Sequence, residues 1–253
     1  DESAALRSGN TQLASALAAL RARQVLFFDP NGNGLAAVVS GDLATAKRVA
    51  IIVPGSDTTL PTFFSRGTAS PGGAADALAA QARALDPHSH LAVIAWLGYT
   101  APALVSPEVL TSGDAAQGAQ ALRPLVTDIA GHGAQVALVC HSYGSVVCGL
   151  AARDLPVTDI AVVGSPGMDA SSAAALGTSA RVWAGRGSGD WIRDVPHTRL
   201  LGLGFGADPM SPAFGARVFA TASGDHSDYF QPGSLSLRNL AWIALGNPAE
   251  VTQ

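Results

Sequence analysis

Residues 136–145 read Val-Ala-Leu-Val-Cys-His-Ser-Tyr-Gly-Ser, and this stretch decides the fold that we predict for the chain. The apolar run 136–139 has the length of a buried strand, and the small residues of 145–153 are typical of a helix. Ser142 therefore lies on a tight turn from a strand into a helix. Such a turn is a nucleophile elbow. It lifts the serine hydroxyl above the sheet edge and directs the free N–H groups of the helix start toward an oxyanion.

The elbow departs from its usual spelling, which is Gly-x-Ser-x-Gly. Cys140 occupies the place of the first glycine, and Gly144 keeps the second. The five-residue pattern alone also fits a serine that simply caps an ordinary helix. The case for a nucleophile therefore depends on the rest of the chain.

Length and composition favour one domain that spans residues 1–253. The chain is 48% hydrophobic, which suits a single α/β domain with a substantial core. Only 13% of its residues are charged, the net charge is −4 and no basic run occurs, so we do not expect nucleic acid as a partner. No apolar run reaches the roughly 18 residues of a transmembrane segment. The first residue is Asp1 rather than Met, so we expect a secreted, mature chain; a cytoplasmic protein stays an alternative.

The order of the predicted elements indicates a mostly parallel sheet. Residues 1–23 carry leucines at helical spacing and predict an N-terminal helix packed on the domain. A hairpin follows, with the turn residues 30–34 between strands 24–29 and 35–40. Strands and helices then alternate, which predicts a mostly parallel α/β sheet covered by helices on both faces. The further strands are 48–53, 91–97, 136–139, 159–163, 181–184 and 217–221, and the further helices are 74–85, 115–130, 145–153, 171–176 and 234–245.

Three residues that suit nucleophilic catalysis follow strands of this sheet. The carboxyl ends of parallel strands share one edge, and Ser142, Asp190 and His226 all lie just beyond such ends. A serine hydroxyl needs a base within hydrogen-bond reach, and a third group must hold that base in the right tautomer. We therefore predict Ser142 as nucleophile, His226 as base and Asp190 as the orienting carboxylate.

Other residues compete for the base and the acid. His197, in a long loop, is the weaker rival for the base, and Asp169 is the main rival for the acid. Asp225 and Asp228 lie too near His226 in sequence to be the first choice for the acid. Among the remaining histidines, His88, His90 and His132 lie at the opposite edge of the sheet, and His141 lies beside the serine.

Backbone N–H groups and aromatic side chains near the strand ends complete the predicted site. We predict the oxyanion donors to be the N–H of Tyr143 and that of Ser56, with Asp57 as the next candidate. We predict substrate contacts from Phe63, Trp96, Tyr99 and Trp191, although aromatic residues at strand ends are often core residues as well. No His/Cys/Asp cluster has metal-ligand spacing, so we expect neither metal nor cofactor.

The two cysteines, Cys140 and Cys148, lie on the strand end and the early helix. Three interpretations stay open: a buried thiol that acts as a small apolar residue, a disulfide, or a thiol at Cys140 that touches the catalytic residues and modulates them.

Four motifs of the chain occur together in one known family. They are Phe27-Phe28-Asp29-Pro30, Val53-Pro54-Gly55-Ser56-Asp57-Thr58-Thr59, Ala95-Trp96-Leu97-Gly98-Tyr99 and His141-Ser142-Tyr143-Gly144-Ser145. With these motifs the chain resembles the α/β-hydrolase fold, and more narrowly a bacterial branch catalogued as a domain of unknown function, in which glycine is usual at position 140. The match covers 24–145 well and is looser through Asp190 and His226-Ser227-Asp228-Tyr229.

The resemblance implies a Ser-His-Asp hydrolase and says little about the natural substrate. We expect a serine esterase that cleaves short or medium acyl esters, either small molecules or lipids, through an acyl-enzyme. Acyl transfer with the same residues and a non-catalytic binding protein on this fold are the alternatives.

Overall fold

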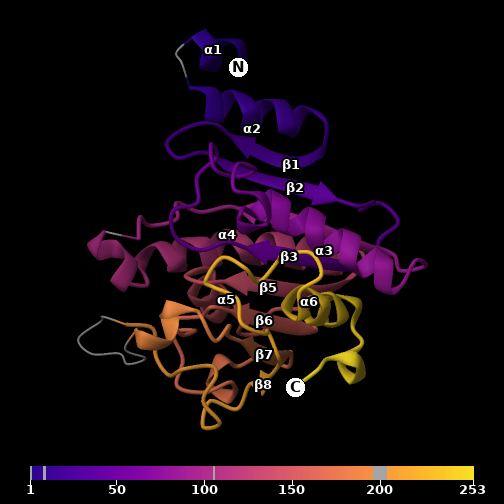
Figure 1. The fold of residues 1–253 in the computed structure, drawn as a ribbon, viewed down its shortest axis with the longest axis vertical. Helices are drawn as coiled ribbons and strands as arrows, with labels where there is room; N and C mark the ends of the chain where they lie inside the picture. The colour runs from indigo at the N-terminus through magenta and orange to yellow at the C-terminus, as the bar shows by residue number, and fades with distance from the viewer. Residues whose placement is uncertain (1, 8–9, 105, 196–203) are drawn as a thin grey trace.

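A computed structural model describes residues 2–7, 10–104, 106–195 and 204–253, and its centre is an eight-stranded sheet. The strands follow one another down the long axis of the molecule in the order β1-β2-β4-β3-β5-β6-β7-β8 (Figure 1). The pairs β1–β2 and β2–β4 are antiparallel, and all later pairs are parallel. The predicted fold class, a mostly parallel sheet that begins with a hairpin, is therefore confirmed. The strands are β1 (Gln24–Asp29), β2 (Leu35–Ser40), β3 (Arg48–Val53), β4 (Leu91–Leu97), β5 (Gln135–His141), β6 (Asp159–Val163), β7 (Arg181–Gly185) and β8 (Arg217–Val218).

Two helical layers cover the two faces of the sheet. Helices α3 (Pro71–Leu85) and α6 (Leu235–Leu245) pack on each other on one face, and α4 (Gly113–Gly131) and α5 (Gly144–Ala151) pack on each other on the other. Strand β3 shows the reason. Its adjacent residues Ile51 and Ile52 belong to opposite cores, because successive side chains of a strand point to opposite faces.

The N-terminal segment differs from the prediction of one helix. It forms α1 (Glu2–Arg7) and α2 (Thr11–Arg21), because the side chain of Asn10 accepts a hydrogen bond from the Leu13 N–H at 3.0 Å and so begins a second helix. Helix α2 packs on the core that α3 and α6 share, through its leucine Leu20. In Figure 1 both helices lie beyond β1, at the end of the molecule opposite β8.

The remaining elements are short. The predicted helix 171–176 is only a 3-10 turn at its end, and the last predicted strand keeps only its first two residues. The 3-10 turns are η1 (Gly67–Ala69), η2 (Pro107–Leu110), η3 (Ala174–Leu176), η4 (Trp191–Asp194) and η5 (Pro248–Glu250).

Candidate active site

Ser142 lies on the turn between β5 and α5 in a conformation that few non-glycine residues adopt. Its φ is 53°, in the left-handed region, and its N–H donates to the Val163 carbonyl of the neighbouring strand β6 at 3.0 Å. Gly144 permits the turn, because a Cβ there would be 2.4 Å from the Val53 carbonyl oxygen of β3. A strained non-glycine residue costs about 1–3 kcal/mol and persists only where the surroundings enforce it. The sequence predicted this elbow correctly.

A disulfide between Cys140 and Cys148 spans the elbow. It joins the end of β5 to α5, and both residues are fully buried. Because these are the two cysteines of the sequence, the interpretations of Cys140 as a free apolar thiol or as a thiol modulator are wrong. The bond instead closes a covalent ring that contains Ser142.

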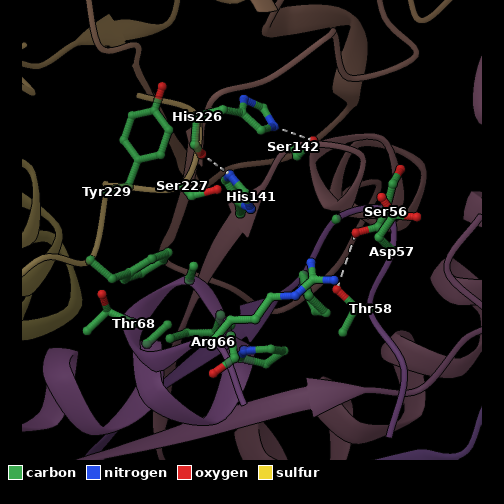
Figure 2. A pocket seen from close by; sticks show the side chains of 18 of the residues that line it. Ser56, Asp57, Thr58, Arg66, Thr68, His141, Ser142, His226, Ser227 and Tyr229 are labelled. Carbon is green, nitrogen blue, oxygen red and sulfur yellow. Dashed lines mark hydrogen bonds between the residues drawn. The ribbon is translucent and has the colours of Figure 1, made fainter. Parts of the chain in front are cut away.

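Ser142, His226 and Asp190 form a continuous hydrogen-bonded chain, and we call these three residues the triad. His226 Nε2 is 2.9 Å from Ser142 Oγ, and His226 Nδ1 is 2.8 Å from Asp190 Oδ1 (Figure 2 shows the first of these contacts). Asp190 and His226 come from the loops that follow β7 and β8. The structure thus brings together the three residues that the strand order placed at one edge.

Asp190 is fully buried and accepts hydrogen bonds from three donors. Besides His226, they are the Ile192 N–H at 2.9 Å and the hydroxyl of Tyr229. Burial raises the pKa of Asp190, but the hydrogen bonds from His226, Tyr229 and Ile192 together hold that pKa below its ordinary value. The carboxylate is therefore ionised at neutral pH, and as an acceptor it fixes the proton of His226 on Nδ1. The opposite nitrogen, Nε2, is then free to accept the serine proton.

Two aromatic side chains that the sequence analysis did not assign hold the triad in place. Tyr229 donates to Asp190 and accepts from the Gly187 N–H at 3.1 Å. His141 Nε2 lies 2.7 Å from the backbone carbonyl of His226 (Figure 2), so Nε2 carries the proton of the neutral ring. Burial, and to a smaller extent the nearby His226, lower the pKa of His141 to about 4. Tyr229 belongs to the motif His226-Ser227-Asp228-Tyr229, so its place three residues after the predicted base was the sequence feature that could have identified it.

Gly164, which follows β6, is a further residue that the sequence analysis missed. Its φ is 55°, and a Cβ there would lie 2.9 Å from Asp190 Oδ2 and 3.1 Å from the His226 ring. The absence of a side chain at this position leaves room for the acid and the base to meet.

The rival residues lie elsewhere or outside the described residues. Asp228 Oδ2 accepts from the N–H of Asp225 at 2.9 Å, and Asp169 donates its N–H to Phe205. None of these three lines the pockets at Ser142. His197 lies outside the residues that the structure describes.

The two predicted oxyanion donors lie beside Ser142. Tyr143 precedes the first residue of α5, and Ser56 lies in the loop after β3. Within the described ranges, neither backbone N–H donates to another protein group, and the buried Ser56 Oγ has no hydrogen-bond partner. The Tyr143 side chain points away into the core, where its hydroxyl donates to the Thr111 carbonyl at 2.7 Å.

Two pockets meet at Ser142. One, which we call the polar cavity because charged and hydroxyl side chains line it beside about as much apolar surface, measures about 260 Å³; its lining includes Arg66, Thr68, His226, Ser227 and Phe230. The other is apolar, measures about 460 Å³ and is lined mainly by Leu104, Leu110, Tyr143, Pro166, Ile192, Val195 and Phe205. Ser56, Leu104, Ser142 and Trp191 line both. Trp191 is 43% exposed, and its ring lies 4.8 Å from that of His226.

Trp191 is the one predicted substrate-contact residue that lines a pocket, and the structure places the other three in the core. Phe63 is fully buried under α3, against Phe64. Trp96 stacks on Tyr99, whose hydroxyl donates to the Pro54 carbonyl at 2.7 Å. The prediction for Phe63, Trp96 and Tyr99 is therefore wrong, because these rings fill the space between the sheet and its helices.

Two negative findings apply to the described part of the chain. There, no group of three or more His, Cys, Asp or Glu side chains is arranged to bind a metal ion. None of the helices there is both long and apolar enough to cross a membrane.

Comparisons with known proteins agree with this architecture. A family model described as "Alpha/beta hydrolase" matches residues 29–200. The uncharacterized protein Rv2079 of Mycobacterium tuberculosis is 34% identical over 87% of this chain, which spans 39% of that relative's length. Mb0988c of Mycobacterium bovis, also uncharacterized, is 33% identical over 56% of this chain and 56% of its own.

Solved structures share the fold at low sequence identity. A dienelactone hydrolase from Anabaena variabilis has a TM-score of 0.55 at 16% identity, over 91% of this chain and 99% of its own. Esterase LipW from Mycobacterium marinum has a TM-score of 0.53 at 15% identity, over 98% of this chain and 89% of its own. The strand order, the elbow and the matched family model lead to one conclusion: this chain belongs to the α/β hydrolase family.

Proposed function

We propose that this hydrolase cleaves carboxylic esters through an acyl-enzyme on Ser142. The observation that carries the proposal is the hydrogen-bonded chain from Ser142 through His226 to the buried, ionised Asp190, on a strained turn that opens into two pockets. A serine activated in this way attacks carbonyl carbon.

The reaction divides into two halves. His226 Nε2 takes the proton of Ser142 as Oγ bonds to the ester carbonyl carbon, and the carbonyl electron pair moves onto oxygen. That oxyanion accepts from the N–H groups of Tyr143 and Ser56. The intermediate collapses, the bond to the alcohol oxygen breaks, and His226 returns its proton to the departing alcohol. Water then repeats the sequence and releases the acid.

Asp190 stabilises the positive charge that forms on His226 in both halves. Its carboxylate already accepts the Nδ1 proton at 2.8 Å, so the stabilisation needs no rearrangement. The family membership supports hydrolysis. The choice of esters rests on the apolar pocket beside the nucleophile, which suits an aliphatic acyl chain of short to medium length.

We also propose that the protein works in an oxidising compartment. The buried disulfide supports this, because such bonds form and persist mainly in secreted and periplasmic proteins.

The first test is labelling with a fluorophosphonate, with the modified peptide mapped by mass spectrometry. We expect wild-type protein to be labelled at Ser142, and labelling to disappear in Ser142→Ala and to fall in His226→Ala. A folded wild-type protein that takes no label contradicts the proposal and favours a binding function. Hydrolysis of 4-nitrophenyl butyrate, octanoate and palmitate then defines the acyl length. Product analysis with added alcohols separates hydrolysis from acyl transfer.

A further inference from the structure

The two pockets at Ser142 differ in which residues of the proposed mechanism they contain. His226, together with Ser227 and Tyr229, lines the polar cavity and not the apolar pocket. Tyr143, one of the two proposed oxyanion donors, lines the apolar pocket and not the polar cavity, whereas Ser56, the other, lines both. Trp191 forms a wall of both.

This division indicates which pocket holds the alcohol part of an ester and which holds the acyl part. The departing alcohol oxygen must receive the proton from His226 Nε2, so the alcohol lies in the cavity that His226 lines. The acyl chain then occupies the apolar pocket. Leu104 and Leu110, 45% and 50% exposed, lie among the residues that line that pocket. Large apolar side chains at a pocket are suited to contact with an aliphatic chain.

The polar cavity offers both hydrogen-bond donors and acceptors. Figure 2 shows the exposed side chain of Arg66 reaching across it toward Thr58, and Arg66 makes no salt bridge with a described residue. Asp57 lines the same cavity, with a carboxylate that accepts from the Leu104 N–H at 3.1 Å. The lining also includes several hydroxyl groups, among them those of Thr58, Thr68 and Ser227, together with apolar side chains such as that of Phe230.

The charges of this cavity favour a neutral ligand. One guanidinium and one carboxylate give these two groups no net charge, so together they offer neither an anionic nor a cationic alcohol a net attraction. A guanidinium donates, a carboxylate accepts and hydroxyl groups do both, which is the set of partners that adjacent hydroxyl groups of a polyol need.

We infer that the substrate is an ester between an aliphatic acid and a neutral polyhydroxy alcohol, such as glycerol or a sugar. The inference rests on the proposed esterase function, and it identifies Asp57 and Arg66 as residues that recognise the alcohol.

The test compares two esters of one acid. Monooctanoylglycerol and methyl octanoate give the same acyl-enzyme, so the ratio of their kcat/KM values reports the alcohol side alone. We expect the wild type to favour the glycerol ester by about tenfold or more, the size of one or two retained hydrogen bonds. Arg66→Ala and Asp57→Asn should each lower that ratio severalfold. Arg238→Ala, an exposed arginine on α6 that lines neither pocket, is the matched control and should keep it.

Further variants and substrates distinguish failure of this inference from failure of the esterase proposal. Leu110→Ser should lower kcat/KM for both esters by the same factor, because it changes the acyl side. A wild-type ratio near one, with both esters cleaved, overturns the inference and leaves the esterase proposal intact. Preference for octanoyl glycerol phosphate over the neutral glycerol ester, lost in Arg66→Ala, also overturns it and indicates an anion site. Absence of any cleavage together with absence of labelling at Ser142 refutes both proposals.

Discussion

Tyr229→Phe tests how much the hydrogen bond from the Tyr229 hydroxyl to the buried Asp190 carboxylate contributes to stability and to ester cleavage. The substitution keeps the ring, so it creates no cavity, and it removes only a hydroxyl that donates to Asp190 and accepts from the Gly187 N–H. A hydrogen bond to a charged group contributes about 1.5–3 kcal/mol, and a buried N–H left without an acceptor costs about 1–3 kcal/mol. We therefore expect a loss of roughly 4 kcal/mol in the free energy of unfolding, within a range of about 2.5–6 kcal/mol.

The effect on ester cleavage should be much smaller. Asp190 keeps the hydrogen bonds from His226 and Ile192, so it stays ionised at pH 8 and continues to orient the base. We expect kcat/KM for a 4-nitrophenyl ester to fall less than about tenfold, far from the roughly 10⁴-fold loss in kcat known when the triad acid of a serine protease is changed to its amide.

Urea denaturation at pH 8 and initial rates on the same sample provide the two measurements. Tyr99→Phe is the matched control, since Tyr99 is an equally buried tyrosine whose hydroxyl donates to one neutral carbonyl. It should cost only about 0.5–1.5 kcal/mol. Equal stability losses in the two variants refute the argument that the charged acceptor dominates. A rate loss above a hundredfold in Tyr229→Phe with unchanged stability shows instead that the hydroxyl acts in the chemistry.

Three further predictions follow from other parts of the site. His141 is buried with a folded-state pKa of about 4, below its unfolded value, so its contribution to stability is present above about pH 6.5 and is lost as the pH falls toward 4. The free energy of unfolding should decrease over this range, and less steeply in His141→Gln; identical pH profiles contradict the assignment. Cys140→Ala and Cys148→Ala break the same bond, whose ends are 8 residues apart, so urea denaturation should show each to lose about 2.5 kcal/mol on the chain-entropy estimate. A loss of kcat/KM confined to Cys140→Ala would argue for a role beyond the disulfide. Gly164→Ala places a Cβ against the triad and should lower kcat/KM by about a hundredfold. Gly215→Ala, which has a positive φ but open space around its Cβ position, controls for backbone strain and should retain the rate.

The strands were predictable because each is an apolar run with turn residues at its ends. Five of the eight have the predicted bounds. In β3 and β6 both faces are buried, and few other structures satisfy so many adjacent apolar residues. Strand β8 was overestimated because only its first two residues pair with β7. The break between α1 and α2 was missed because leucine spacing continues across Asn10, and only its capping side chain marks the boundary.

The site was predictable only where a residue followed a strand end in sequence. Ser142, Asp190 and His226 satisfied that rule. They come together because the carboxyl ends of parallel strands lie at the same edge of the sheet. Aromatic residues near strand ends gave no such information: Trp96 belongs to β4 itself and points into the core, while Trp191 reaches the pockets. Arg66 was missed because it lies in an irregular segment, where the sequence does not indicate what a side chain faces.

The meeting of two pockets at one serine has a kinetic consequence. If esters are cleaved as proposed, the first product leaves the polar cavity while the acyl group stays in the apolar pocket. The position beside His226 is then open to any hydroxyl compound, and water competes there with alcohol molecules for the acyl-enzyme. Hydrolysis and acyl transfer are thus two branches of one partition. Their ratio is set by how fully the cavity that contains Asp57 and Arg66 is occupied by alcohol when the second half of the cycle begins.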